Sequence, residues 1–304
     1  MFLSARSRRG RGIGLIVVVA LLAGLAAYGR YLGYPHGRVF TLVPAAAPRR
    51  DGTVAVFLSG DLGFNAGMGP VIAGHMAQGG LPVLGVNSLT AFAQRRSLEE
   101  SAALVEQAAR RALALPGARR LVLVGQSFGA NMLLAGLERL SPSLRGRVVM
   151  VALIVPADSM LFRATPGGVF DFGNDGPAAP AAHALDWVPV LCIHGLEESG
   201  SLCPGWRQRN VRVIGLPGGH FLRDDSARVA ATLLGALPVA PPNIAKNSDN
   251  AEPPAIWTGL ETRIVPGKDG SYGEGEALGR VGGGDRASGV DSVWLRRDRS
   301  GVAA

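Results

Sequence analysis

The chain has 304 residues, a formal net charge of +8 and 47% hydrophobic residues. This apolar content excludes a wholly disordered protein, and the length allows one domain of ordinary size with extensions at its ends. The arginines are scattered singly and in pairs rather than gathered in one run. This indicates a solvated surface and argues against a nucleic-acid-binding protein.

The N-terminus predicts a membrane segment. Residues 1–12 form a basic region whose arginines are Arg6, Arg8, Arg9 and Arg11. An uncharged apolar stretch over 13–29 follows, and Arg30 closes it. Arginines stay on the cytoplasmic side, so the rest of the chain is expected in the periplasm. The stretch favours an uncleaved inner-membrane anchor; a signal cleaved near 45–47 and a buried helix are the alternatives.

Beyond a Pro- and Ala-rich segment over 30–50, expected to be a linker, apolar runs alternate with helical patterns. Strands are expected at 54–58, 81–86, 121–124, 148–155, 188–193 and 211–214. Helices are expected at 97–115, 129–140 and 225–237, the first of them opening on a capping box of Ser97 and Glu100. The alternation predicts an α/β domain over 51–240, with a mostly parallel sheet and helices on both faces.

Two segments break this alternation. Residues 156–186 are rich in Gly, Pro, Phe and Asp and are expected to form a short cap, with a plain surface loop as the alternative. Residues 241–304 lack apolar periodicity and are expected to be a disordered tail with no assigned function. Open parallel sheets bind ligands at the carboxyl ends of their strands, which is where the polar motifs of this chain fall.

Residues 125–129 read Gly-Gln-Ser-Phe-Gly, a G-x-S-x-G motif placed between a predicted strand and a predicted helix. In α/β hydrolases this motif is the nucleophile elbow, where a strained turn presents a serine at the edge of the sheet. Serine is a weak nucleophile by itself and needs a neighbouring base. Ser127 is therefore the candidate nucleophile of an α/β-hydrolase fold.

His220 is the candidate base, because it follows the last predicted strand through a Gly-Gly turn. His194, which also ends a strand, is its competitor. The acid that orients the base should follow the preceding strand, where the segment 192–198 offers Glu198 and, as an alternative, Glu197. The resulting order of serine, acid and histidine is that of α/β hydrolases.

A serine hydrolase also needs backbone N–H groups that stabilise the oxyanion. Phe128 offers one such group, and the loop after the first predicted strand offers those of Asp61 or Leu62. Asp61 could instead cap the next helix. Neither a cofactor nor a metal is expected, since the Cys, His and Glu residues over 192–220 match no zinc-ligand spacing.

Cys192 and Cys203 are the two cysteines of the chain. An even pair in an exported protein indicates a disulfide, whereas in a cytosolic protein it would indicate two buried thiols. The predicted export therefore favours a Cys192–Cys203 bridge.

The chain resembles the bacterial virulence protein family VirJ/AcvB between residues 54 and 237. The resemblance is carried by five motifs: SGDLGF at 59–64, GVNSLTAF at 85–92, GQSFGAN at 125–131, CIHGLEESGSLCP at 192–204 and LPGGHF at 216–221. It implies a periplasmic α/β hydrolase linked to virulence and type IV secretion, with Ser127 as nucleophile, His220 as base and a disulfide. Gln126 and Asn131 stand where the family tends to have tyrosine and aspartate.

The resemblance further implies hydrolysis of aminoacyl-phosphatidylglycerol, chiefly the lysyl form. We therefore expect a membrane-anchored periplasmic serine esterase whose substrate is a membrane lipid. Asp61 or Asp158, both after predicted strands, could bind the ammonium groups of a lysyl ester. The alternative is a non-catalytic binding protein or chaperone that serves secretion-system proteins on a hydrolase fold.

Overall fold

The computed structural model describes residues 5–171, 173–238, 264–266 and 272–274, and the side chains of residues 13–171 and 173–238. The side chains of the basic region over 1–12 and nearly all of the predicted tail over 241–304 lie outside the described residues. Within the tail, β10 (Ile264–Pro266) pairs in antiparallel fashion with β11 (Tyr272–Glu274).

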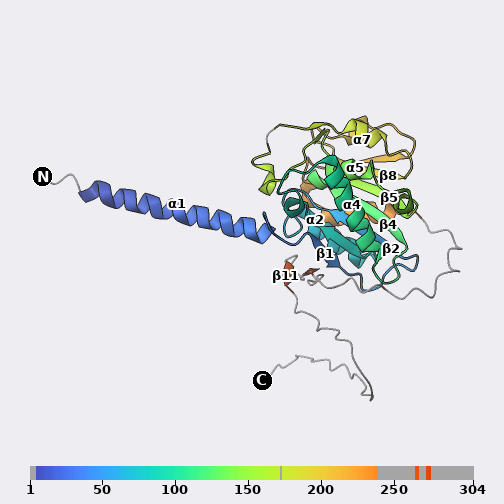
Figure 1. Ribbon diagram of the computed structural model, residues 1–304, viewed down its shortest axis with the longest axis horizontal. Helices are drawn as coiled ribbons and strands as arrows, with labels where there is room; N and C mark the ends of the chain where they lie inside the picture. The colour runs from blue at the N-terminus through green and yellow to red at the C-terminus, as the bar shows by residue number, and fades with distance from the viewer. Residues whose placement is uncertain (1–4, 172, 239–263, 267–271, 275–304) are drawn as a thin grey trace, which may run out of the picture.

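A seven-stranded sheet forms the centre of the domain (Figure 1). Its strands in spatial order are β1 (Phe40–Val43), β3 (Val83–Val86), β2 (Thr53–Leu58), β4 (Arg120–Gln126), β5 (Val148–Ile154), β8 (Val190–Gly195) and β9 (Val211–Leu216). All neighbouring pairs are parallel except β1 with β3. The predicted α/β fold with a mostly parallel sheet is confirmed.

The segment over 30–50 is not the simple linker that was expected. β1 lies within it and pairs in antiparallel register with β3, from Phe40 opposite Val86 to Val43 opposite Val83. Its side chains alternate between half-buried and buried, as in a strand at the edge of a sheet. Four residues between Pro- and Ala-rich flanks are too short a run to reveal this pairing in the sequence.

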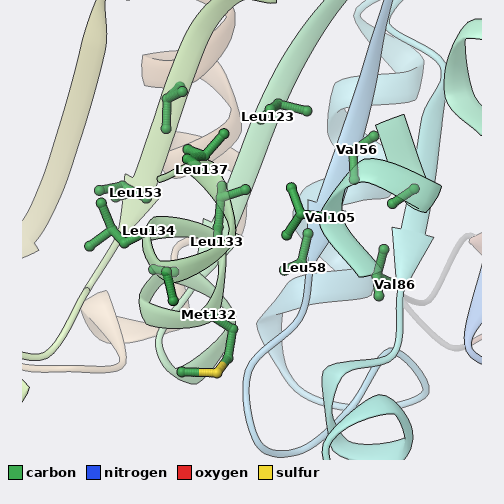
Figure 2. Packing of buried hydrophobic residues seen from close by; sticks show 14 of the residues in the cluster. Val56, Leu58, Val86, Val105, Leu123, Met132, Leu133, Leu134, Leu137 and Leu153 are labelled. Atoms are coloured by element: carbon green, nitrogen blue, oxygen red, sulfur yellow. The ribbon is translucent and has the colours of Figure 1, made fainter. Parts of the chain in front are cut away.

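Helices cover both faces of the sheet because the pleat turns alternate side chains to opposite sides. On β2, Val56 and Leu58 pack with α4 (Leu98–Leu113) and α5 (Phe128–Leu137), as Figure 2 shows. Phe57 faces the other way, toward α2 (Met68–Gln78) and α8 (Ser226–Ala236). The two resulting apolar clusters hold the sheet between the helix layers.

The shorter elements lie mostly in the connections. α3 (Ser88–Ala91) follows β3, and α6 (Pro142–Arg145) precedes β5. Between β5 and β8 the chain forms β6 (Ser159–Met160), η1 (Pro166–Gly168), β7 (Gly176–Pro177) and α7 (Ala179–His183). β6 and β7 pair as a small ribbon, so the segment expected to be a cap is a loop-rich excursion from the carboxyl edge of the sheet.

Two features bear on where the protein resides. α1 (Ala5–Leu32) extends away from the domain (Figure 1), and its stretch Ile13–Leu32 has a mean hydropathy of 2.1 and is long enough to cross a membrane. The predicted disulfide is present, since Cys192 in β8 is bonded to Cys203 in η2 (Cys203–Gly205). The apolar helix suggests an anchor or a signal, and the bridge suggests an oxidising compartment.

Candidate active site

Ser127 lies in the tight turn between β4 and α5. Its backbone has φ 51° and ψ −124°, a region that costs a non-glycine residue of order 1–3 kcal/mol. The flanking glycines are needed because strand and helix come very close here. A Cβ on Gly125 would lie 2.5 Å from the Cα of Ala130, and one on Gly129 would overlap the carbonyl oxygen of Ser59. The motif thus forms a strained elbow.

Three side chains from three loops meet in one hydrogen-bonded chain. The Oγ of Ser127 lies 2.8 Å from Nε2 of His220, and Nδ1 of His220 lies 2.5 Å from Oε1 of Glu198. The second carboxylate oxygen of Glu198 accepts the N–H of Gly195 at 3.2 Å. The Glu198 side chain is only 5% exposed, whereas that of His220 is 41% exposed. The Glu198 carboxylate is therefore held in place by two hydrogen bonds, while His220 remains accessible to a ligand.

The two competing residues lie elsewhere. Glu197 is 65% exposed and forms an ion pair with Arg223 at 3.2 Å. Nδ1 of His194 lies 3.0 Å from the carbonyl oxygen of Gly195, its own neighbour. Neither of these residues joins the chain of hydrogen bonds at Ser127.

The loop after β2 lies against the serine. A Cβ on Gly60 would be 3.5 Å from that of Ser127, which brings the backbone of Asp61 and Leu62 to the site. Burial raises the pKa of the Asp61 carboxyl; the neighbouring His220 opposes this rise, and the nearby carboxylate of Asp171 adds to it. The backbone N–H groups of Asp61 and Leu62 also lower this pKa, so its carboxylate lies beside the expected oxyanion donors.

A cavity of about 570 Å³ opens over Ser127 and His220. Asp61, Leu62 and Gln126 line it. Phe128 begins α5 immediately after Ser127, so its backbone N–H is at the N-terminus of that helix. A space of this size accommodates a small headgroup or an acyl chain segment.

Asp158 does not share this cavity. It is exposed beyond β5, where its backbone N–H donates to the carbonyl oxygen of Gly200 at 2.9 Å. The expectation that Asp158 binds substrate is therefore not supported by its position. Two acidic residues that the sequence did not single out lie closer. Asp224 lines the cavity, and Asp171 in the segment over 156–186 has a buried Oδ1 with no partner among the described residues.

The position of Asp224 depends on an unusual turn. Leu222, Arg223 and Asp224 have φ values of 48°, 55° and 56°, so three successive non-glycine residues adopt the left-handed conformation. No propensity predicts such a run, because each residue is disfavoured there. The nearness of Asp224 to His220 in sequence is the only signal that could have indicated it.

A mostly parallel sheet, an elbow serine after β4, and an acid and a histidine after β8 and β9 define an α/β hydrolase. The profile of the family described as bacterial virulence protein (VirJ) matches residues 52–240, which is more than half of the chain. The chain therefore belongs to the VirJ family. No curated protein sequence matches it.

Solved structures with a similar fold are remote in sequence. Est1E from Butyrivibrio proteoclasticus has 13% identity and a TM-score of 0.46, covering 64% of this chain and 93% of its own. The lipase BlEst2 from Bacillus licheniformis has 12% identity and a TM-score of 0.47, with coverages of 64% and 97%. An esterase domain from Rhodothermus marinus has 18% identity and a TM-score of 0.45, with coverages of 64% and 89%.

Proposed function

We propose that the protein is a membrane-anchored serine hydrolase that cleaves ester bonds at the periplasmic face of the inner membrane. The observation that carries this proposal is the chain of hydrogen bonds from Ser127 through His220 to Glu198, at 2.8 and 2.5 Å. A buried acid, an accessible histidine and a strained serine beside a cavity are the parts that acyl transfer requires.

In the proposed reaction, His220 accepts the proton of the Ser127 hydroxyl while the serine oxygen attacks the ester carbonyl. The backbone N–H groups of Phe128 and of Asp61 or Leu62 stabilise the oxyanion. His220 then gives its proton to the departing alkoxide, which leaves an acyl-enzyme. Water attacks this ester by the same route in reverse, releasing the acid and restoring Ser127. Glu198 holds the histidine in position and stabilises its positive charge. No cofactor takes part.

The substrate we propose is a cationic aminoacyl ester of a membrane lipid, with lysyl-phosphatidylglycerol as the leading candidate. Its support is the resemblance in sequence together with the acidic wall of the cavity, where Asp61 and Asp224 lie. A carboxylate paired with a substrate ammonium gains a charge-assisted hydrogen bond of about 1.5–3 kcal/mol. That is roughly ten- to 150-fold in selectivity over a neutral acyl ester.

For the location, the fold supports an uncleaved anchor. Leu32 at the end of α1 is fully buried in the domain, and β1 is a strand of the central sheet. Cleavage near 45–47 would remove both from the folded chain. The Cys192–Cys203 bridge agrees with a periplasmic domain.

The proposal is tested with the purified full-length protein in vesicles that contain lysyl-phosphatidylglycerol. Wild type should release lysine, and folded Ser127→Ala should lose several orders of magnitude of this activity. A soluble butyryl ester assayed in parallel should be a poorer substrate. Lysine release by Ser127→Ala at the wild-type rate would contradict the serine mechanism. No hydrolysis of any ester by the wild type would favour the binding or chaperone function instead.

A further inference from the structure

The membrane helix does not end in a loose tether. Tyr31, in the last turn of α1, donates its hydroxyl to the carbonyl oxygen of Asn65 at 3.0 Å. In return, Nδ2 of Asn65 donates to the carbonyl oxygen of Tyr31 at 2.7 Å. This reciprocal pair fixes the end of α1 on the loop that follows β2.

A second pair of hydrogen bonds holds the next residues. Nδ2 of Asn87 donates to the carbonyl oxygen of Leu32 at 3.0 Å, and Oγ1 of Thr90 donates to that of Gly33 at 2.7 Å. Gly33 has φ 87°, and a Cβ there would lie 2.9 Å from Oγ1 of Thr90, so only glycine fits. Because four side-chain hydrogen bonds cross the junction, the direction of α1 sets the orientation of the domain.

The loop that binds α1 is also a wall of the cavity. Asp61 lines the cavity and lies four residues before Asn65, which corresponds to at most about 14 Å of extended chain. Gly167, in the segment over 156–186, donates its N–H to the carbonyl oxygen of Asp61 at 3.2 Å. The cavity wall at Asp61 therefore lies within about 14 Å of the point at which α1 joins the domain.

Exposed apolar side chains gather at the same edge of the sheet. Outside α1, the large apolar residues that are exposed in the described part of the chain are Val169, Phe170, Leu196 and Phe221, with exposures of 61–66%. Phe221 lines the cavity, and Val169 follows Gly167, which also lines it. We call Val169, Phe170 and Phe221 the apolar rim. Large exposed apolar groups flanking one opening indicate an interaction surface.

A cationic residue accompanies this rim. Arg163 is exposed, and its guanidinium donates to the carbonyl oxygen of Phe170 at 3.3 Å. Aromatic rings with a neighbouring arginine suit the boundary between acyl chains and anionic headgroups. The rim thus has the chemistry of a surface that binds lipid, and the hydrogen bond from Gly167 to Asp61 joins its segment to the loop that holds α1.

We propose that the apolar rim rests on the bilayer in which α1 is anchored, so that an ester-linked headgroup enters the cavity without leaving the membrane. The docking itself depends on the rim and on the junction with α1. Its consequence for turnover rests on the proposed hydrolase function. The occupant of the rim is the lipid surface rather than another protein.

Labelling tests the docking independently of any activity. The chain has two cysteines, and they are bonded to each other, so an introduced cysteine is the one reactive thiol. Full-length Val169→Cys would carry an environment-sensitive fluorophore in vesicles of phosphatidylethanolamine and phosphatidylglycerol. Ser143→Cys, at the exposed start of α6 on the opposite edge of the sheet, is the matched control.

Lipids brominated on their acyl chains should quench the label at position 169 at least several-fold more than the label at position 143. Equal, weak quenching at both positions would overturn the proposal. Asn65→Ala should reduce the quenching at position 169, because it removes one of the bonds that orient the domain.

Hydrolysis rates of rim variants provide a second test of the proposal. Val169→Asp combined with Phe170→Asp should lower hydrolysis of a vesicle-embedded aminoacyl lipid at least tenfold and leave hydrolysis of a soluble butyryl ester unchanged. Ser143→Asp should change neither rate. Equal losses on both substrates would overturn the role of the rim in lipid entry. Failure of the wild type on both esters would refute the proposed function, and the labelling would still decide the docking.

Discussion

Glu198→Gln is the change that best separates the proposed triad from a chance grouping of polar residues. The carboxylate of Glu198 is 5% exposed and lies 2.5 Å from Nδ1 of His220. During attack by Ser127 the imidazole becomes positively charged, so the carboxylate stabilises the transition state more than the resting state. A charge-assisted hydrogen bond contributes about 1.5–3 kcal/mol, or roughly ten- to 150-fold in rate.

Glutamine adds a second loss. Its amide can donate a hydrogen to Nδ1 of His220, which leaves the ring proton on Nε2 and removes the lone pair that accepts the serine proton. The combined loss expected for Glu198→Gln is about 10²–10⁴-fold in kcat/KM. Glu197→Gln is the matched control, because it breaks only an exposed ion pair with Arg223 worth about 0–1 kcal/mol. Its activity should stay within about twofold of wild type.

The assay is hydrolysis of a soluble chromogenic ester, with circular dichroism and a thermal melt to show that each variant is folded. The pattern predicted is a large loss for Glu198→Gln, little change for Glu197→Gln and no difference in their folds. Equal activities of the two variants would refute the reasoning, since a carboxylate that can be replaced without effect does not orient the base.

Three further predictions concern stability. Gly129→Ala should lower the free energy of unfolding by more than about 3 kcal/mol, because the added Cβ would overlap backbone oxygens. Gly235→Ala in α8 has open space around its Cβ and should raise the free energy of unfolding by about 0.5–1 kcal/mol. Urea titrations of the two variants and the wild type would measure both changes. Cys192 and Cys203 are 11 residues apart, so removing their disulfide should lower the free energy of unfolding by about 3 kcal/mol. An unchanged midpoint in the same urea titration would contradict this prediction. Burial raises the pKa of Asp61, so the folded state holds its proton more tightly, and stability from this group falls as pH rises through that pKa. Asp61→Asn should therefore have a higher Tm than the wild type at neutral pH, and the two Tm values should converge in acid. A difference in Tm that does not change with pH would refute burial of the Asp61 carboxylate as its cause.

The central fold follows from local patterns in the sequence. Apolar runs such as 121–124 are buried on both sides, and the capping box at Ser97 begins α4 as expected. β1 was missed because an edge strand depends on its partner β3, which lies forty residues further along the chain. Pairing of this kind leaves little trace in a four-residue run.

The sequence predicts those residues of the candidate site that belong to a motif of fixed spacing. It does not predict those whose place in the site depends on which side chain the fold buries. The G-x-S-x-G motif locates Ser127 because only glycines fit around the elbow. Glu197 and Glu198 are adjacent, and only the fold shows that one faces His220 while the other faces solvent. Asp224 reaches the cavity through three left-handed residues that no pattern predicts.

The most direct test of the central claim is covalent trapping of the nucleophile. A fluorophosphonate reacts with a serine that a neighbouring base has activated and leaves a stable adduct. Intact-mass and peptide measurements on the folded full-length protein should show one adduct, carried by Ser127. His220→Ala should abolish it, and Ser127→Ala should show none. No adduct on the folded wild type, or one that persists in Ser127→Ala, would contradict the proposal that this site is a serine hydrolase.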